Sequence, residues 1–267
     1  MNQPGMIVSI NGQLTPVEAA RIDPRDRAFT LGDGLYETIR VRDGRLMRID
    51  RHFARLDEGL RLLEIRLKLD ENALAGAMRT VLNANHLDNA ALRLTVSRGS
   101  AARGLAPDLT ARPTVVISAV PHAPPGPARI MIATVTRRNA QSPISRIKTT
   151  SCLDSILARM EATRNDMDDA ILLNGEGWIA EATAANVFAV IDRVLVTPPL
   201  SDGALPGVMR AAIMAHTPLG ECSLSADDLL RADEIFLTSS LGIRPVVAFE
   251  DRTLPPGPVA SRLIAEL

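Results

Sequence analysis

The sequence contains few of the residues that mark several common classes of protein. Only two cysteines occur in 267 residues, too few for a disulfide framework. Aromatic residues make up 3% of the chain, so aliphatic side chains must fill any core. The net charge is −1 and no basic block stands out, which argues against nucleic acid as the main partner. No run of about 20 apolar residues is present, so we expect no membrane span.

Other signals are also missing. The four histidines have neither an H-x-x-x-H spacing nor a neighbouring cysteine pair, so we expect no metal site. The N-terminus has no basic start followed by an apolar segment, so we expect no signal peptide. These features together predict a soluble cytoplasmic protein. Hydrophobic residues make up 46% of the chain, enough for a substantial core in one large domain or two modest ones.

A cluster of prolines between positions 121 and 127 is the best candidate for a domain boundary, because proline-rich segments form stiff linkers. We therefore expect an N-terminal domain over residues 1–120, a linker over 121–129 and a C-terminal domain over 130–267. Both domains mix strand and helix patterns, which predicts an α/β fold. The expected helices cover residues 50–63, 71–87, 152–166, 207–214, 226–230 and 258–266.

The segment around Lys148 combines the end of a strand pattern with the start of a helix. Leu153, Ile156, Leu157 and Met160 follow a helical spacing after it. Residues 149–151 are of the types that cap helices. A lysine at such a junction has a rigid backbone, and its amine, when partly desolvated, can form a Schiff base. A surface lysine is the alternative, since charged residues are mostly exposed.

Two further motifs follow in order along the chain. The first is Glu181-Ala-Thr-Ala-Ala-Asn186, at the end of an apolar strand pattern. The second is Leu205-Pro-Gly-Val-Met-Arg210, which opens a helix. With Lys148, and with an H-x-x-R-L signature at His52 to Leu56, these motifs closely resemble the class IV aminotransferases. That family has pyridoxal-phosphate fold type IV and includes D-amino-acid and branched-chain aminotransferases and aminodeoxychorismate lyase.

The resemblance implies a two-domain α/β enzyme, with a smaller N-terminal and a larger C-terminal domain and the cofactor pyridoxal 5'-phosphate between them. Lys148 would hold the cofactor aldehyde and serve as the catalytic base. Glu181 would keep the ring nitrogen protonated, Asn186 would brace the turn beside it, and Leu205 would pack on the ring.

The same resemblance assigns donors to the cofactor phosphate. Arg55 would bind it with its guanidinium fork, although a solvated helix arginine is the alternative. Gly207 would allow close approach, and the first amides of the following helix, those of Val208 and Met209, would face the anion. Many relatives have threonine at the position of Met209. The hydroxyls of Ser239 and Ser240 would also contact the phosphate.

On the substrate side, the resemblance assigns Tyr36, the only tyrosine, and Arg103. Arg103 matches an arginine with which D-amino-acid aminotransferases bind the substrate carboxylate, but Leu105 stands where those enzymes have histidine. An exposed loop arginine is the alternative for Arg103. Family members are homodimers, so we expect a homodimer here.

The predicted function is amino transfer between a small amino acid and a 2-oxo acid through a Schiff base on Lys148. The alternative within the family is 4-amino-4-deoxychorismate lyase, which eliminates pyruvate to give 4-aminobenzoate for folate. Met209 and the pattern Ser97-Arg-Gly with Arg103-Gly104 favour this alternative. A non-catalytic protein that binds pyridoxal phosphate or another small molecule is the hypothesis of a different class.

Overall fold

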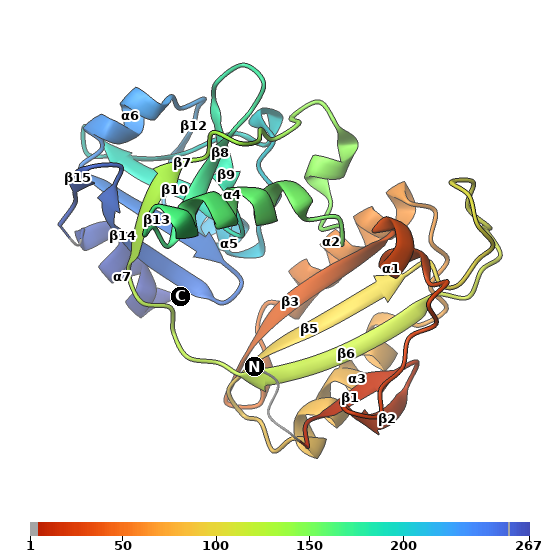
Figure 1. The fold of residues 1–267 in the computed structure, drawn as a ribbon. Helices are drawn as coiled ribbons and strands as arrows, with labels where there is room; N and C mark the ends of the chain where they lie inside the picture. Colours follow the sequence, from red (N-terminus) through yellow and green to blue (C-terminus); the bar gives the residue numbers. More distant parts are fainter. Residues whose placement is uncertain (1–4, 256) are drawn as a thin grey trace. The chain divides into compact units, whose positions relative to one another are not determined.

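The computed structural model describes residues 5–255 and 257–267, which form two compact units (Figure 1). The first unit contains the described residues up to Ala123 together with Ile147–Ser151. The second unit contains Pro124–Arg146 and Cys152–Leu267. The chain thus divides between Ala123 and Pro124, inside the expected linker, and a short later segment around Lys148 joins the first unit.

The first unit is built on an antiparallel six-stranded sheet with the order β2-β1-β6-β5-β3-β4. Alternation of side chains along its strands separates a buried face from an open one. In β3 the buried positions include Leu35, Glu37 and Ile39, whereas Tyr36 and Thr38 are less buried. The strands are β1 (Ile7–Ile10), β2 (Gln13–Pro16), β3 (Gly34–Arg42), β4 (Arg45–Leu46), β5 (Ala90–Ser97) and β6 (Thr114–Pro121).

Helices α2 (Ile49–Leu62) and α3 (Glu71–Ala84) cover the buried face of this sheet. Their apolar side chains share one core cluster with those of β3, β5 and β6. A short helix, α1 (Arg27–Leu31), precedes β3. The sequence pattern predicts a loop up to Arg27 and does not predict this helix, because five residues are too few to show a helical period.

The second unit contains a mixed nine-stranded sheet with the order β12-β11-β10-β13-β14-β7-β8-β9, to which β15 adds beside β14. Its central strands are buried along most of their length, and Phe188 of β10 stacks on Phe236 of β13. The strands are β7 (Ala128–Ile132), β8 (Asp169–Leu173), β9 (Ile179–Ala182), β10 (Asn186–Ile191), β11 (Val194–Thr197), β12 (Gly220–Glu221), β13 (Glu234–Ser239), β14 (Gly242–Phe249) and β15 (Arg252–Thr253).

The longer helices of this unit pack on the sheet through separate apolar clusters. They are α4 (Leu153–Arg164), α5 (Val208–His216), α6 (Ala226–Arg231) and α7 (Pro258–Glu266). Two short 3-10 turns, η1 (Pro143–Arg146) and η2 (Leu200–Asp202), lie in the connections. In the described residues, no helix is long and apolar enough to cross a membrane.

The expected helices are confirmed, with starts that differ by one residue in α2, α4 and α5. The sequence predicts Asp50 as the N-cap residue of α2, but this helix begins after Arg48, which has a left-handed backbone with φ 53°, and Asp50 lies in the first turn. Helix α4 begins after Cys152 without a side-chain cap, so none of residues 149–151 is the N-cap residue. In the second case the preceding residues instead pair with β3 of the first unit.

The apolar side chains that predict α4 do not face a core within the described structure. Leu153, Ile156, Leu157 and Met160 are 45–71% exposed. The helix packs instead through the small residues Ala158 and Ala162, which lie against β7 and β8. The pattern therefore indicates a helix correctly, while the apolar stripe stays on the surface of the single chain.

Candidate active site

Lys148 is fixed against the edge of β3 by main-chain hydrogen bonds. The amide of Tyr36 donates to the Lys148 carbonyl at 2.9 Å, and the amide of Thr150 donates to the Gly34 carbonyl at 2.9 Å. The neighbouring Ile147 is buried in the core of the first unit. The backbone on both sides of the lysine is therefore tied to the first unit, while its side chain is only partly buried.

Two cations lie over the ring of Tyr36. The Lys148 Nζ is 4.5 Å from the ring centroid, and the Arg93 Cζ is 3.8 Å from it. Such contacts are attractive because the face of an aromatic ring is electron-rich. Arg93 is not among the site residues predicted from sequence. The sequence signal for Arg93 is its place on the polar side of the alternating β5 pattern. In the structure it lies opposite Thr38 of β3.

Arg55 lies in a buried ion pair that the sequence motif does not reveal. Its Nε donates to Glu37 Oε1 at 2.8 Å, its Nη2 donates to Glu37 Oε2 at 2.5 Å, and His52 Nδ1 lies 2.6 Å from the same Oε2. All three side chains are buried. Burial by itself raises the pKa of the Glu37 carboxyl, but the hydrogen bonds from Arg55 and His52 outweigh it and hold the pKa below its usual value.

The alternating pattern of β3 also indicates that Glu37 is buried. It occupies an inward position of the β3 alternation, between Leu35 and Ile39. A carboxylate at such a position needs a buried partner, and the helix motif that carries Arg55 supplies it.

In the second unit, Glu181 lies in β9 with its carboxylate held from two sides. Arg138 Nη2 lies 3.1 Å from Oε1, and the Leu205 amide donates to Oε2 at 2.9 Å. Arg138 is fixed in turn, because its Nε donates to the Gly203 carbonyl at 3.0 Å. Arg138, which is not among the residues predicted from the sequence, thus orients the Glu181 carboxylate.

Asn186 links this carboxylate to the start of α5. Its Nδ2 donates to the Leu205 carbonyl at 2.9 Å, while Leu205 donates to Glu181. A Cβ added to Gly207 would lie 1.9 Å from Asn186 Oδ1, so only glycine fits there. As the N-cap residue of α5, Gly207 has no side chain with which to cap the amides of Val208 and Met209. A helix N-terminus of this kind suits an anion such as phosphate.

The remaining predicted residues lie in two further places. Ser239 ends β13 and Ser240 follows it, with Ser239 Oγ accepting from the Leu241 amide at 3.2 Å. The Thr238 hydroxyl beside them is buried and has no hydrogen-bond partner among the described residues. Arg103 lies on the exposed loop between β5 and β6.

The structure thus brings part of the predicted set together, as two groups, and Arg55 belongs to neither because it pairs with Glu37. In the first unit these are Tyr36 and Lys148, with Arg93 beside them. In the second unit, Glu181, Asn186, Leu205 and Gly207 form one hydrogen-bonded arrangement at the start of α5. An amine, a fixed carboxylate and a helix N-terminus are each among the groups that pyridoxal phosphate requires, and each unit supplies residues of these types.

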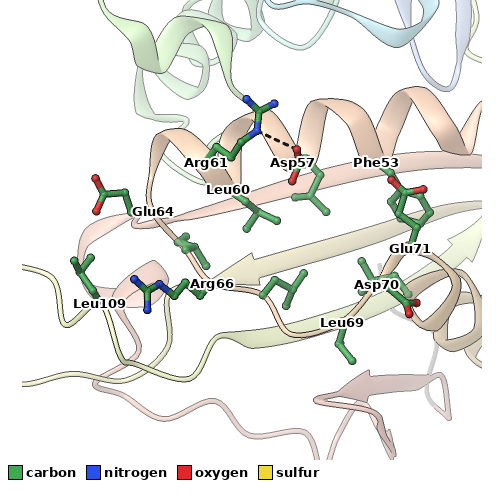
Figure 2. Close-up of a pocket in the computed structure, with 14 residues that line it drawn as sticks. Phe53, Asp57, Leu60, Arg61, Glu64, Arg66, Leu69, Asp70, Glu71 and Leu109 are labelled. Carbon is green, nitrogen blue, oxygen red and sulfur yellow. Dashed lines mark hydrogen bonds and ion pairs between the residues drawn. The ribbon is translucent and has the colours of Figure 1, made fainter.

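A separate pocket of about 720 Å³ opens between α2 and α3 in the first unit (Figure 2). Its walls include Phe53, Leu60 and Leu69, and its rim carries the ion pair of Arg61 with Asp57. None of the predicted site residues lines it. This pocket is therefore distinct from both groups described above.

Comparison with known proteins identifies the family to which the chain belongs. The family model of amino-transferase class IV matches residues 34–249. The D-alanine aminotransferase of Bacillus licheniformis is 28% identical over 273 residues, covering 97% of this chain and 94% of its own. The aminodeoxychorismate lyase of Bacillus subtilis is 29% identical over 258 residues, covering 92% and 87%.

A solved structure agrees with these sequence matches. The T.th. branched-chain amino acid aminotransferase complexed with N-(5'-phosphopyridoxyl)-L-glutamate superposes with a TM-score of 0.90 at 25% identity. The match covers 100% of this chain and 93% of that one. The two-domain α/β fold predicted from the sequence is thereby confirmed.

Proposed function

Because the chain belongs to the class IV aminotransferase family, we propose that it transfers amino groups between a small amino acid and a 2-oxo acid, with the cofactor held on Lys148. The chain is an enzyme of this pyridoxal-phosphate-dependent class. The observation that carries the proposal is the fixed position of Lys148 beside Tyr36 and Arg93. Bound cofactor supplies an aldehyde for the substrate amine and a ring that withdraws electron density.

The roles of the residues follow from their surroundings. Lys148 Nζ removes the proton from the substrate Cα and later returns it, which a flexible amine on a rigid backbone suits. Glu181, oriented by Arg138, holds a proton on the cofactor ring nitrogen. Gly207 opens the helix whose first amides bind the phosphate, and Arg55 is the proposed second donor to it.

Arg93 supports a dicarboxylic 2-oxo acid as the amino acceptor. It projects from the open face of the first sheet, and its guanidinium stacks on Tyr36 next to Lys148. A guanidinium there offers a fork of donors to a second carboxylate. The branched-chain enzyme of the solved structure is complexed with a phosphopyridoxyl derivative of glutamate, the amino acid that such an acceptor would yield.

The proposed function is tested by assaying the purified protein with D-alanine or L-leucine as donor and 2-oxoglutarate or pyruvate as acceptor. We expect transfer to 2-oxoglutarate with at least one donor. In the Arg93→Leu variant, KM for 2-oxoglutarate should rise by about tenfold or more, because a contact to a charged group is lost, while KM for pyruvate should change little. No transfer with any pair would contradict the proposal.

Arg103 is the proposed partner of the substrate α-carboxylate. It lies on the exposed loop between β5 and β6, flanked by Gly104. Removal of a contact made equally in the ground and transition states raises KM without changing kcat. Arg103→Ala should therefore raise KM for every accepted amino acid, and an unchanged KM would remove Arg103 from the site.

Aminodeoxychorismate lyase is the second candidate function. Met209 is the residue that favours the lyase on sequence grounds, because many relatives have threonine there. Its side chain packs in the core with Phe188 and Ile213 and offers no hydroxyl. The lyase of Bacillus subtilis is also among the relatives. Incubation with aminodeoxychorismate distinguishes the two functions, because a lyase releases pyruvate without any amino acceptor.

The exposed apolar stripe of α4 supports a homodimer. Leu153, Ile156, Leu157 and Met160 form a contiguous apolar surface on one helix, which is typical of an interaction site. Leu157→Glu should yield monomers in light scattering, whereas Thr163→Glu, at an exposed position on the same helix, should leave dimers. Dimers of the Leu157 variant would exclude α4 as the interface. The expected cytoplasmic location stays a prediction.

A further inference from the structure

Arg27 is a buried arginine whose three nitrogens contact two different parts of the first unit. Its Nε donates to Asp33 Oδ2 at 2.7 Å. Its Nη1 donates to the Gly104 carbonyl at 2.9 Å, and its Nη2 donates to the Leu105 carbonyl at 3.0 Å. The side chain is 6% exposed. One guanidinium therefore connects the turn before β3 to the middle of the loop between β5 and β6.

That loop, residues 99–112, is otherwise exposed over most of its length. Its base is closed by Asp26, whose carboxylate accepts hydrogen bonds from Ser97 and Thr114, and by the Arg27 amide, which donates to the Gly99 carbonyl at 2.9 Å. Gly99 has φ 100°, and a Cβ there would lie 2.0 Å from the Arg112 carbonyl oxygen. The base of the loop is thus fixed. The Arg27 fork holds the middle of the 99–112 loop, at Gly104 and Leu105, next to Arg103.

Asp33 shares its carboxylate between Arg27 and a second buried arginine, Arg98. Arg98 Nε donates to Asp33 Oδ2 at 2.7 Å, while its Nη2 donates to the Leu63 carbonyl at 2.6 Å. Burial raises the pKa of Asp33, but hydrogen bonds from Arg98 and Arg27 outweigh this and lower it overall. The two arginines thus form matched ion pairs with different targets: Arg27 holds the 99–112 loop, and Arg98 holds the end of α2.

We propose that Arg27 is a positioning residue that holds the 99–112 loop so that Arg103 meets the substrate carboxylate. This inference rests on the proposed role of Arg103. Two adjacent carbonyls held by one planar fork fix both the position and the direction of the peptide beside Arg103. Lysine keeps the charge beside Asp33 but presents no planar fork, so Arg27→Lys should release the loop while largely preserving the ion pair.

The test compares Arg27→Lys with the matched control Arg98→Lys in the cofactor-loaded enzyme. We expect Arg27→Lys to raise KM for the amino donor by about tenfold, the size of one weakened contact to a charged group, with kcat within about twofold. Amide hydrogen exchange in residues 100–112 should become faster. Arg98→Lys should leave the KM of the donor and this exchange unchanged, because its carbonyl targets lie at the end of α2.

A double variant completes the test. Arg27→Lys combined with Arg103→Ala should have the same KM as Arg103→Ala alone, because Arg27 acts through Arg103. Additive effects on KM, or unchanged exchange in Arg27→Lys, would overturn the inference. Failure of the proposed function is seen separately, as wild-type protein without amino transfer or as Arg103→Ala with an unchanged KM.

Discussion

The buried pair of Arg55 and Glu37 gives a quantitative prediction about stability. Both side chains are at most 7% exposed, and two hydrogen bonds join them. Arg55→Met leaves the Glu37 carboxylate buried with His52 as its remaining ionisable partner. Breaking a buried pair by removing one partner costs about 3–5 kcal/mol. At about 2–4 °C per kcal/mol, this corresponds to a fall in melting temperature of roughly 6–20 °C.

A matched control separates this loss from a general effect of changing α2. Arg61 and Asp57 form an ion pair on the same helix, but both are about two-thirds exposed (68% and 65%). A surface pair of this kind contributes about 0–1 kcal/mol. Arg61→Met should therefore lower the melting temperature of the cofactor-free protein by only about 0–4 °C.

The double variant Arg55→Met/Glu37→Gln should be more stable than either single variant, because no unpaired charge stays buried. Arg55→Lys should lose cofactor affinity, because a single ammonium cannot serve both the Glu37 carboxylate and the phosphate. The assay is urea unfolding of the cofactor-free protein alongside titration with pyridoxal phosphate. If Arg55→Met costs no more than Arg61→Met, the reasoning about the buried pair is wrong.

Three further predictions concern the candidate site and the ion pairs of the first unit. Borohydride should fix the cofactor to a peptide containing Lys148, and labelling of another lysine would contradict the proposed mechanism. Glu181→Gln should retain the cofactor but lose roughly ten- to hundred-fold in kcat, the size of one charge-assisted contact; full activity would make the residue structural. Asp33 has a lowered pKa in the folded state, so its contribution to stability is present above its unfolded pKa of about 3.9 and is lost as the pH falls through the folded value. The melting temperature of Asp33→Asn should therefore be lower than that of wild type at pH 6, with a gap that narrows toward pH 3, and a constant gap would exclude this linkage.

Most elements of the fold and the order of the functional motifs can be predicted from the sequence. Helical spacings predict α3 and α5 to within three residues at each end, because this periodicity depends only on which side chains must avoid water. The motifs around Lys148, Glu181 and Gly207 also indicate the family directly.

The partners of these residues depend on the folded structure. Lys148 follows the linker in sequence, yet its segment pairs with β3, because backbone groups at a sheet edge accept any extended segment that reaches them. The partnerships of Arg55 with Glu37 and of Arg27 with Gly104 join residues 18 and 77 positions apart. Local periodicity contains no information about such pairs, since it reports which face of an element is buried and not what packs against it. For the same reason the apolar stripe of α4 predicts a helix, while only the packed structure shows that Ala158 and Ala162 face the sheet and the stripe faces outward.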